Sequence, residues 1–112
     1  MKKDNQLYLQ DIIEAIEKIE QYVENKKFDD FAGNAMMQDA VIRQFEIIGE
    51  SAKRLTPDFL ESHKDFPFKK AIAMRNLLIH EYDYINVESV WKTIKEDLPD
   101  FKDNINKILK KL

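Results

Sequence analysis

The chain contains no cysteine, and only two glycines and three prolines among its 112 residues. Without cysteine it can form neither a disulfide framework nor a thiolate zinc site. So few turn-forming residues, beside abundant Ile, Leu, Glu and Lys, predict an all-α fold. No glycine-rich phosphate loop, paired-carboxylate centre or cluster of metal ligands stands out in the sequence, so we expect neither a metal nor a bound cofactor.

Long apolar runs are also missing. The N-terminal stretch has two lysines but no apolar segment long enough for a signal peptide, and nothing approaches the length of a membrane span. We therefore expect a cytoplasmic protein that does not enter a membrane. A content of 44% hydrophobic and 35% charged residues is typical of a soluble globular protein. The length predicts a single domain, residues 1–112, with a genuine core.

The net charge is also small, because the many acidic and basic residues nearly balance: the formal net charge is −3. An acidic balance argues against a protein that holds nucleic acid by bulk electrostatics, and we expect no DNA binding. The segment 63–82 is nevertheless a small basic island. Its charged residues are Lys64, Lys69, Lys70 and Arg75 against Asp65 and Glu81.

Apolar residues recur at steps of three and four along most of the chain, which predicts one helical bundle. The two longest stripes are Leu9, Ile12, Ile16, Ile19 and Val23, and Val41, Phe45, Ile48, Ala52 and Leu55. The expected helices are 4–24, 31–55 with Asp29 or Asp30 as N-cap, a short helical turn with Thr56 as its cap, 67–80, and 86–112 with a kink or interruption at Pro99. The helix 31–55 is apolar on more than one side. It therefore needs more than one neighbour, or a partner subunit.

The stretch "MRNLLIHEY" (74–82) places Arg75, Asn76 and His80 in an otherwise apolar segment. On an ideal helix, Arg75 and His80 are about 140° apart around the axis, with Cβ atoms roughly 10 Å apart. They can meet on one substrate only through the reach of the arginine, a helix end at His80, or a second copy of the chain. Asn76 precedes His80 by one turn.

These side chains suit the cleavage of RNA. An imidazole can move a proton near neutrality, and a guanidinium can hold a phosphate by two parallel hydrogen bonds. Asn76 could orient the ring or bind a phosphate oxygen. The structural alternative is that Arg75 pairs with a carboxylate and His80 caps a helix C-terminus. His63 is expected to be a solvated loop residue and Trp91 a core residue.

The stretch has the form Arg-Asn-x-x-x-His-x-Tyr, with four residues between Arg75 and His80. It resembles the R-X4-6-H motif of HEPN domains, in the R-X4-H-X-Y version of the HepT-like family. The blocks 39–55, 66–86 and 90–99 resemble the family as well, so the similarity covers nearly the whole chain. Phe68 stands where the family pattern has Trp, a change expected to affect packing and not chemistry.

The resemblance implies an up-and-down HEPN bundle of four to five helices that forms a homodimer, with the two motifs facing a shared cleft. It implies a metal-independent endoribonuclease toxin of a prokaryotic toxin–antitoxin pair. Arg75 would bind the scissile phosphate, His80 would act as general acid or base, and Asn76 would support them. The antitoxin would be an MntA-type minimal nucleotidyltransferase that transfers AMP to Tyr82.

Two other interpretations remain open at the level of sequence. A non-catalytic subunit could present a substrate, or itself, to a nucleotidyltransferase, and the acidic net charge favours this interpretation over a free ribonuclease. A helical dimer without chemistry is the third. A neighbouring nucleotidyltransferase gene would support the first two, and RNA cleavage by the purified protein would separate them.

Overall fold

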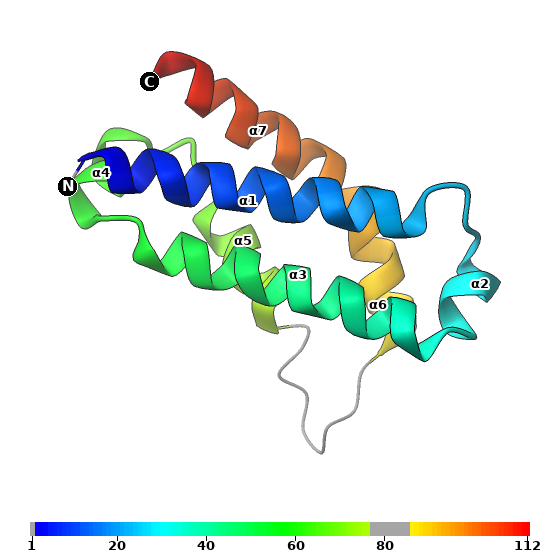
Figure 1. Cartoon of the computed structure of the whole chain (residues 1–112). Helices are drawn as coiled ribbons and strands as arrows, with labels where there is room; N and C mark the ends of the chain where they lie inside the picture. Colours follow the sequence, from blue (N-terminus) through cyan, green and yellow to red (C-terminus); the bar gives the residue numbers. More distant parts are fainter. Residues whose placement is uncertain (1, 77–85) are drawn as a thin grey trace.

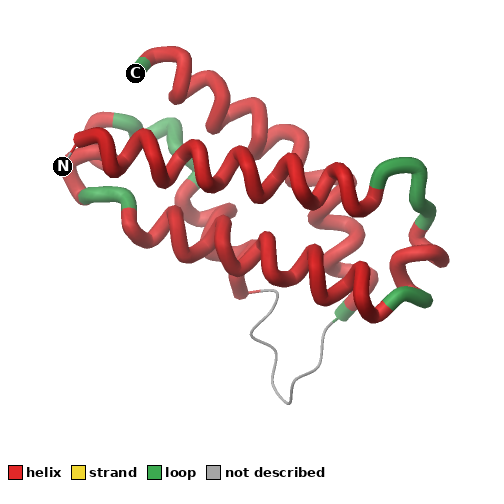
Figure 2. The backbone as a smooth tube through the Cα atoms, in the orientation of Figure 1, coloured by secondary structure: helices red, strands yellow, loops and turns green. Residues whose placement is uncertain are grey.

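The chain folds into a bundle of helices, and the computed structural model describes residues 2–76 and 86–112, which contain no strand. The long helices α1 and α3 lie side by side, α5 packs against α3, and α7 packs against α1 (Figure 1). Short turns and loops join these elements (Figure 2). The bounds are α1 (Lys2–Val23), α2 (Phe28–Ala32), α3 (Ala35–Arg54), α4 (Pro57–Ser62), α5 (Phe68–Asn76), α6 (Val87–Lys92), η2 (Thr93–Asp97) and α7 (Leu98–Lys111). The predicted all-α class is confirmed.

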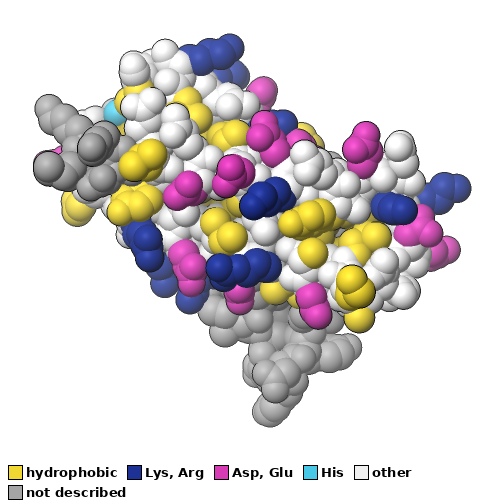
Figure 3. All heavy atoms as spheres, in the orientation of Figure 1, with side chains coloured by type: hydrophobic (Ala, Val, Ile, Leu, Met, Phe, Trp, Pro, Cys, Tyr) yellow, Lys and Arg dark blue, Asp and Glu magenta, His cyan; other side chains and the backbone are white. Residues whose placement is uncertain are grey.

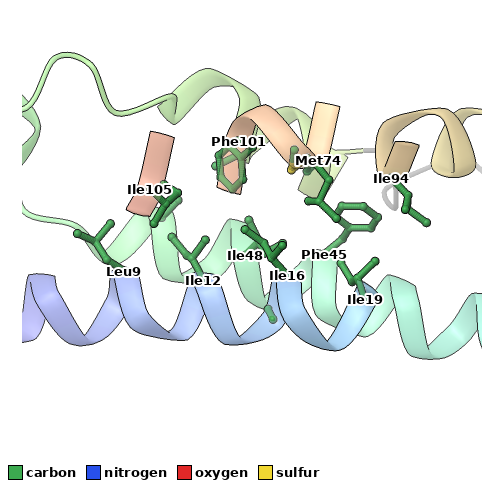
Figure 4. Close-up of a cluster of buried hydrophobic side chains, with 14 of the residues drawn as sticks. Leu9, Ile12, Ile16, Ile19, Phe45, Ile48, Met74, Ile94, Phe101 and Ile105 are labelled. Carbon is green, nitrogen blue, oxygen red and sulfur yellow. The ribbon is translucent and has the colours of Figure 1, made fainter. Parts of the chain in front are cut away.

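The core lies where the apolar stripes of the helices meet (Figure 4). The predicted stripe of α1 is buried along its whole length, and so is the predicted stripe of α3. Each large apolar side chain removed from water contributes about 1.5–3 kcal/mol, so these stripes supply the main driving force for the bundle. The buried stripe residues are Leu9, Ile12, Ile16, Ile19 and Val23 on α1, and Val41, Phe45, Ile48, Ala52 and Leu55 on and just after α3.

The predicted helix 31–55 is broken near its start, which corrects that expectation. Helix α2 ends at Ala32, Gly33 follows as its C-cap, and α3 begins at Ala35. The Asn34 side chain accepts a hydrogen bond from the Met37 backbone N–H at 2.9 Å. An N-cap side chain of this kind starts a new helix by accepting a hydrogen bond from its first turn. This hydrogen bond competes with the backbone hydrogen bonds that would continue α2, so the chain turns here.

The expected N-cap was also wrong. The residue before α2 in the capping position is Lys27, and its backbone N–H donates to the Asp30 carboxylate at 2.9 Å. Asp29 and Asp30 lie inside the first turn instead, where negative charge is favoured by the helix dipole. Helix α2 is held to the bundle by aromatic contacts, since the Phe31 and Trp91 rings lie 5.3 Å apart.

The interruption expected at Pro99 is present and begins before the proline. Residues Thr93–Asp97 form a π-helical turn, in which the Leu98 N–H donates to the Thr93 carbonyl oxygen five residues earlier. Because Pro99 has no N–H, it cannot donate a hydrogen bond to the carbonyl oxygen four residues earlier. In the wider π-helical turn, each backbone N–H instead donates to the carbonyl oxygen five residues earlier. The chain changes direction between α6 and α7 as a result (Figure 1).

The predicted helix 67–80 is described from Phe68 to Asn76, as α5. The remainder of that prediction, with His80 and Tyr82, lies outside the described residues. Within the part of the chain that is described, no helix is both long enough and apolar enough to cross a membrane.

Candidate functional site

Arg75 and Asn76 are the last described residues of α5, a helix anchored in the core. Ala71 and Met74 of the same helix are buried. Arg75 itself is half-buried, whereas Asn76 is exposed. The structure therefore places a half-buried guanidinium beside an exposed amide on α5. How these two groups lie relative to His80 stays a prediction.

The stem of Arg75 lies directly on the backbone of α3, at Gly49. A Cβ built on Gly49 would lie 2.7 Å from the Arg75 Cδ and 2.8 Å from its Cγ, and would overlap its Cβ. Heavy atoms of two side chains cannot approach this closely, so only glycine fits at this position. A glycine inside a helix costs about 1 kcal/mol relative to alanine. The close approach of α3 and α5 requires it.

Sequence reasoning gave Gly49 no role, although it lies in the motif block 39–55 that resembles the family. The signal was available, because Gly49 is the only glycine within a long run of good helix formers. An isolated glycine inside a helical pattern usually has a packing or functional reason. Its partner could not be identified from the sequence, since nothing local links position 49 to position 75.

A hollow of about 230 Å³ lies between α5 and η2, lined by Lys70, Ala73, Met74, Thr93 and Asp97. Lys70 Nζ lies 3.9 Å from Asp97 Oδ1 across it, and both side chains are about half exposed. Ala73 and Arg75 are about 160° apart around an ideal helix. The hollow is therefore on the side of α5 away from Arg75, and it does not extend the arginine's site.

A wider hollow, of about 540 Å³, lies at the beginning of α5. The basic island partly surrounds it, since its lining includes His63, Lys64, Lys69 and Lys70. Its charge is reduced by neighbouring acids: Lys64 Nζ lies 3.4 Å from a Glu61 oxygen, and Lys70 approaches Asp97. On the face formed by α1 and α3, acidic and basic side chains are also interspersed (Figure 3).

His63 differs from its predicted role as a solvated loop residue. It caps the C-terminus of α4, its ring stacks on Phe59 with centroids 4.2 Å apart, and its Nδ1 lies 3.1 Å from the Phe59 carbonyl oxygen. His63 is thus half-buried, and its ring packs against the end of α4 instead of lying free in solvent. In residues 2–76 and 86–112, no group of three or more His, Asp or Glu side chains is placed to hold a metal ion.

The fold and the site together define a class: an all-α bundle whose helix α5 carries an arginine seated against a glycine of α3 and followed by an exposed asparagine. A protein-family model described as "Ribonuclease HepT-like" matches residues 12–108. The chain belongs to this HepT-like family, and the resemblance seen in the motif blocks is confirmed.

Two relatives illustrate the range of the family. "Probable ribonuclease HepT" of Thermococcus cleftensis is 43% identical over 110 residues, which are 98% of this chain and 100% of that protein. "Gamma-glutamylcyclotransferase and putative RNase MJ0434" of Methanocaldococcus jannaschii is 42% identical over 112 residues, 100% of this chain and 50% of that protein. The chain thus spans half the length of the second relative. No solved structure matches the chain.

Proposed function

We propose that the protein is a metal-independent endoribonuclease, the toxin of a HEPN–nucleotidyltransferase toxin–antitoxin pair. The observation that carries this proposal is the seat of Arg75, a half-buried arginine of α5 held against α3 in a chain of the HepT-like family. A guanidinium whose stem is fixed by packing is pre-organised to bind a phosphate. The names of the two relatives, both of which include a ribonuclease, support the same reaction.

In the proposed reaction, His80 acts as general acid or general base: as base it takes the proton from the ribose 2'-hydroxyl, and as acid it gives a proton to the leaving 5'-oxygen. The 2'-oxygen attacks phosphorus, and the bond from phosphorus to the 5'-oxygen breaks. A general acid protonates that leaving oxygen, so the products carry a 2',3'-cyclic phosphate and a 5'-hydroxyl. Arg75 stabilises the negative charge that gathers on the phosphoryl oxygens, and Asn76 supplies a further hydrogen bond. Side chains provide both the proton transfer and the charge stabilisation, so no metal is needed.

The proposed partner is a minimal nucleotidyltransferase of the MntA type. It would neutralise the toxin by transferring AMP from ATP to the hydroxyl oxygen of Tyr82, two residues after His80, with release of pyrophosphate and the hydroxyl proton. The added phosphodiester would bring a negative charge next to the motif, and a phosphate there can compete with RNA for the guanidinium. The proposed assembly is a homodimer, in which two copies of the motif share one cleft.

The test is RNA cleavage by the purified protein in EDTA, compared with His80→Ala. We expect the wild type to cut a single-stranded RNA to 2',3'-cyclic phosphate ends. The variant should be slower by roughly 10²- to 10⁴-fold, the usual contribution of general acid–base catalysis. Circular dichroism must show the same helical content for both proteins.

Two results would contradict the proposal. Activity that disappears on chelation and returns with magnesium would indicate a metal mechanism. A folded wild type that cuts no RNA but binds a nucleotidyltransferase would support the non-catalytic binding subunit, which the net charge of −3 favours.

A further inference from the structure

Gly49 occupies a gap in one strip of α3. Steps of four, three and four place Ile42, Glu46, Gly49 and Lys53 on the same side of the helix. Among them only Gly49 is buried, and Ile42 and Glu46 are half-buried while Lys53 is exposed. This side of α3 therefore carries side chains before and after Gly49, where only the backbone faces α5. The stem of Arg75 fills this space.

We infer that Gly49 is a positioning residue for Arg75, an inference that rests on the proposed ribonuclease function. The missing Cβ lets α5 come close enough for the Arg75 Cβ, Cγ and Cδ to lie on the backbone of α3. The first part of the side chain is thereby restricted in its rotamers, and only the outer guanidinium remains to be oriented by the substrate. Restricting a catalytic cation before the substrate arrives lowers the cost of reaching the productive geometry.

The contact is too deep to be relieved by the end of a flexible side chain. An added Cβ at position 49 would meet the Arg75 Cβ as well as its Cγ and Cδ, and the Cβ moves only when the α5 backbone moves. Gly49→Ala must therefore push α5 away from α3 at Arg75. This shift displaces the guanidinium, and a misplacement of about 1 Å can cost a reaction roughly 100-fold in rate.

The other glycine provides a matched control. A Cβ on Gly33, between α2 and α3, would meet only the Asp29 carbonyl oxygen, at 3.3 Å. Its φ of −95° is negative, so alanine avoids the left-handed region there. Gly33→Ala adds the same methyl group to a tight backbone site in another part of the bundle.

The experiment measures kcat and KM for RNA cleavage by the wild type, Gly49→Ala and Gly33→Ala. We expect Gly49→Ala to lower kcat by roughly 10- to 100-fold with a smaller change in KM. Gly33→Ala should stay within about twofold of the wild type. Tm values of both variants, measured in parallel, show how much of the folded state each retains at the assay temperature.

A second pair of variants separates positioning from general damage. In an Arg75→Ala background, adding Gly49→Ala should change the residual cleavage by less than about twofold, because the group that Gly49 positions has already been removed. A purely structural defect would lower activity again by the full factor seen in the wild-type background.

The failure of this inference is distinguishable from the failure of the proposed function. A wild type that cleaves no RNA overturns the proposed function. A wild type that cleaves RNA, with Gly49→Ala equally active, overturns the role of Gly49 alone. Equal losses from Gly49→Ala in the wild-type and Arg75→Ala backgrounds also overturn it.

Discussion

Asn5 and Thr56 are joined by two hydrogen bonds that tie the beginning of α1 to the beginning of α4. The Asn5 Nδ2 donates to Thr56 Oγ1 at 3.1 Å, and the Thr56 backbone N–H donates to Asn5 Oδ1 at 3.0 Å. Thr56 Oγ1 also accepts from the Phe59 N–H at 3.2 Å as the N-cap of α4. One hydroxyl thus serves a local cap and a contact between distant segments.

Thr56→Ala removes the two hydrogen bonds that the hydroxyl accepts, from Asn5 Nδ2 and from the Phe59 N–H, and keeps the bond from its own backbone N–H to Asn5 Oδ1. The lost cap costs about 1 kcal/mol and the lost side-chain partner about as much again, so Tm should fall by roughly 10 °C. Thr56→Ser keeps the hydroxyl oxygen and should stay within a few degrees of the wild type. The measurement is thermal unfolding followed by circular dichroism. Combining Thr56→Ala with Asn5→Ala should cost less than the sum of the single variants, and strict additivity would show that the two side chains do not interact.

Arg75→Lys tests the guanidinium without disturbing its seat. Lysine has the same Cβ, Cγ and Cδ atoms that lie on Gly49, so the fold and Tm should be unchanged. An ammonium group cannot reproduce two parallel hydrogen bonds to a phosphate, and cleavage should fall by roughly 10²-fold or more. The readout is the rate of RNA cleavage at saturating RNA. A lysine variant with wild-type activity would mean that Arg75 contributes only positive charge.

The homodimer is predicted from apolar surface that the single chain leaves uncovered. Met36 on α3 is 83% exposed, and Met37 and Ile47 on the same helix are only half-buried. Stable homodimers bury on the order of 2,000 Å² or more of core-like surface. Light scattering after size exclusion should therefore give about twice the chain mass of 13.3 kDa. A monomer at micromolar concentration would contradict the dimer and the shared cleft.

Mixing two inactive variants tests whether that cleft is composite. If Arg75 of one protomer works with His80 of the other, a heterodimer of Arg75→Ala and His80→Ala contains one intact site. Unfolding the two variants together and refolding them should then restore about a quarter of the wild-type activity, since half of the dimers are mixed and each has one of two sites. No restoration, with mixed dimers present by mass spectrometry, would place both residues in the same protomer's site.

The Tyr82 prediction concerns regulation. Incubation with the cognate nucleotidyltransferase, ATP and magnesium should add AMP to the peptide that contains Tyr82 and abolish RNA cleavage. Tyr82→Phe should take up no AMP and should remain active in the presence of the partner. Tyr84 lies two residues further on and serves as the internal control. Mass spectrometry that maps the adduct to Tyr84, or neutralisation without any adduct, would contradict the assignment.

The sequence by itself determined the features that depend on near neighbours in the chain. The spacing of Leu9, Ile12, Ile16 and Ile19 identified the buried face of α1, because a helix repeats every 3.6 residues whatever surrounds it. Thr56 was identifiable as a cap for the same local reason. The adjacent Arg75 and Asn76 pointed to a site, since polar residues in an apolar helix require an explanation.

Only the tertiary structure decided what depends on segments that are distant in sequence. The break at Asn34 was missed because apolar spacing continues through it. The packing of Phe31 on Trp91, which is distant in sequence, stabilises α2 as a separate helix. The seat of Arg75 on Gly49 could not be predicted at all. The seat depends on the distance between α3 and α5. Side chains of both helices set that distance when they pack together, so neither sequence segment determines it alone.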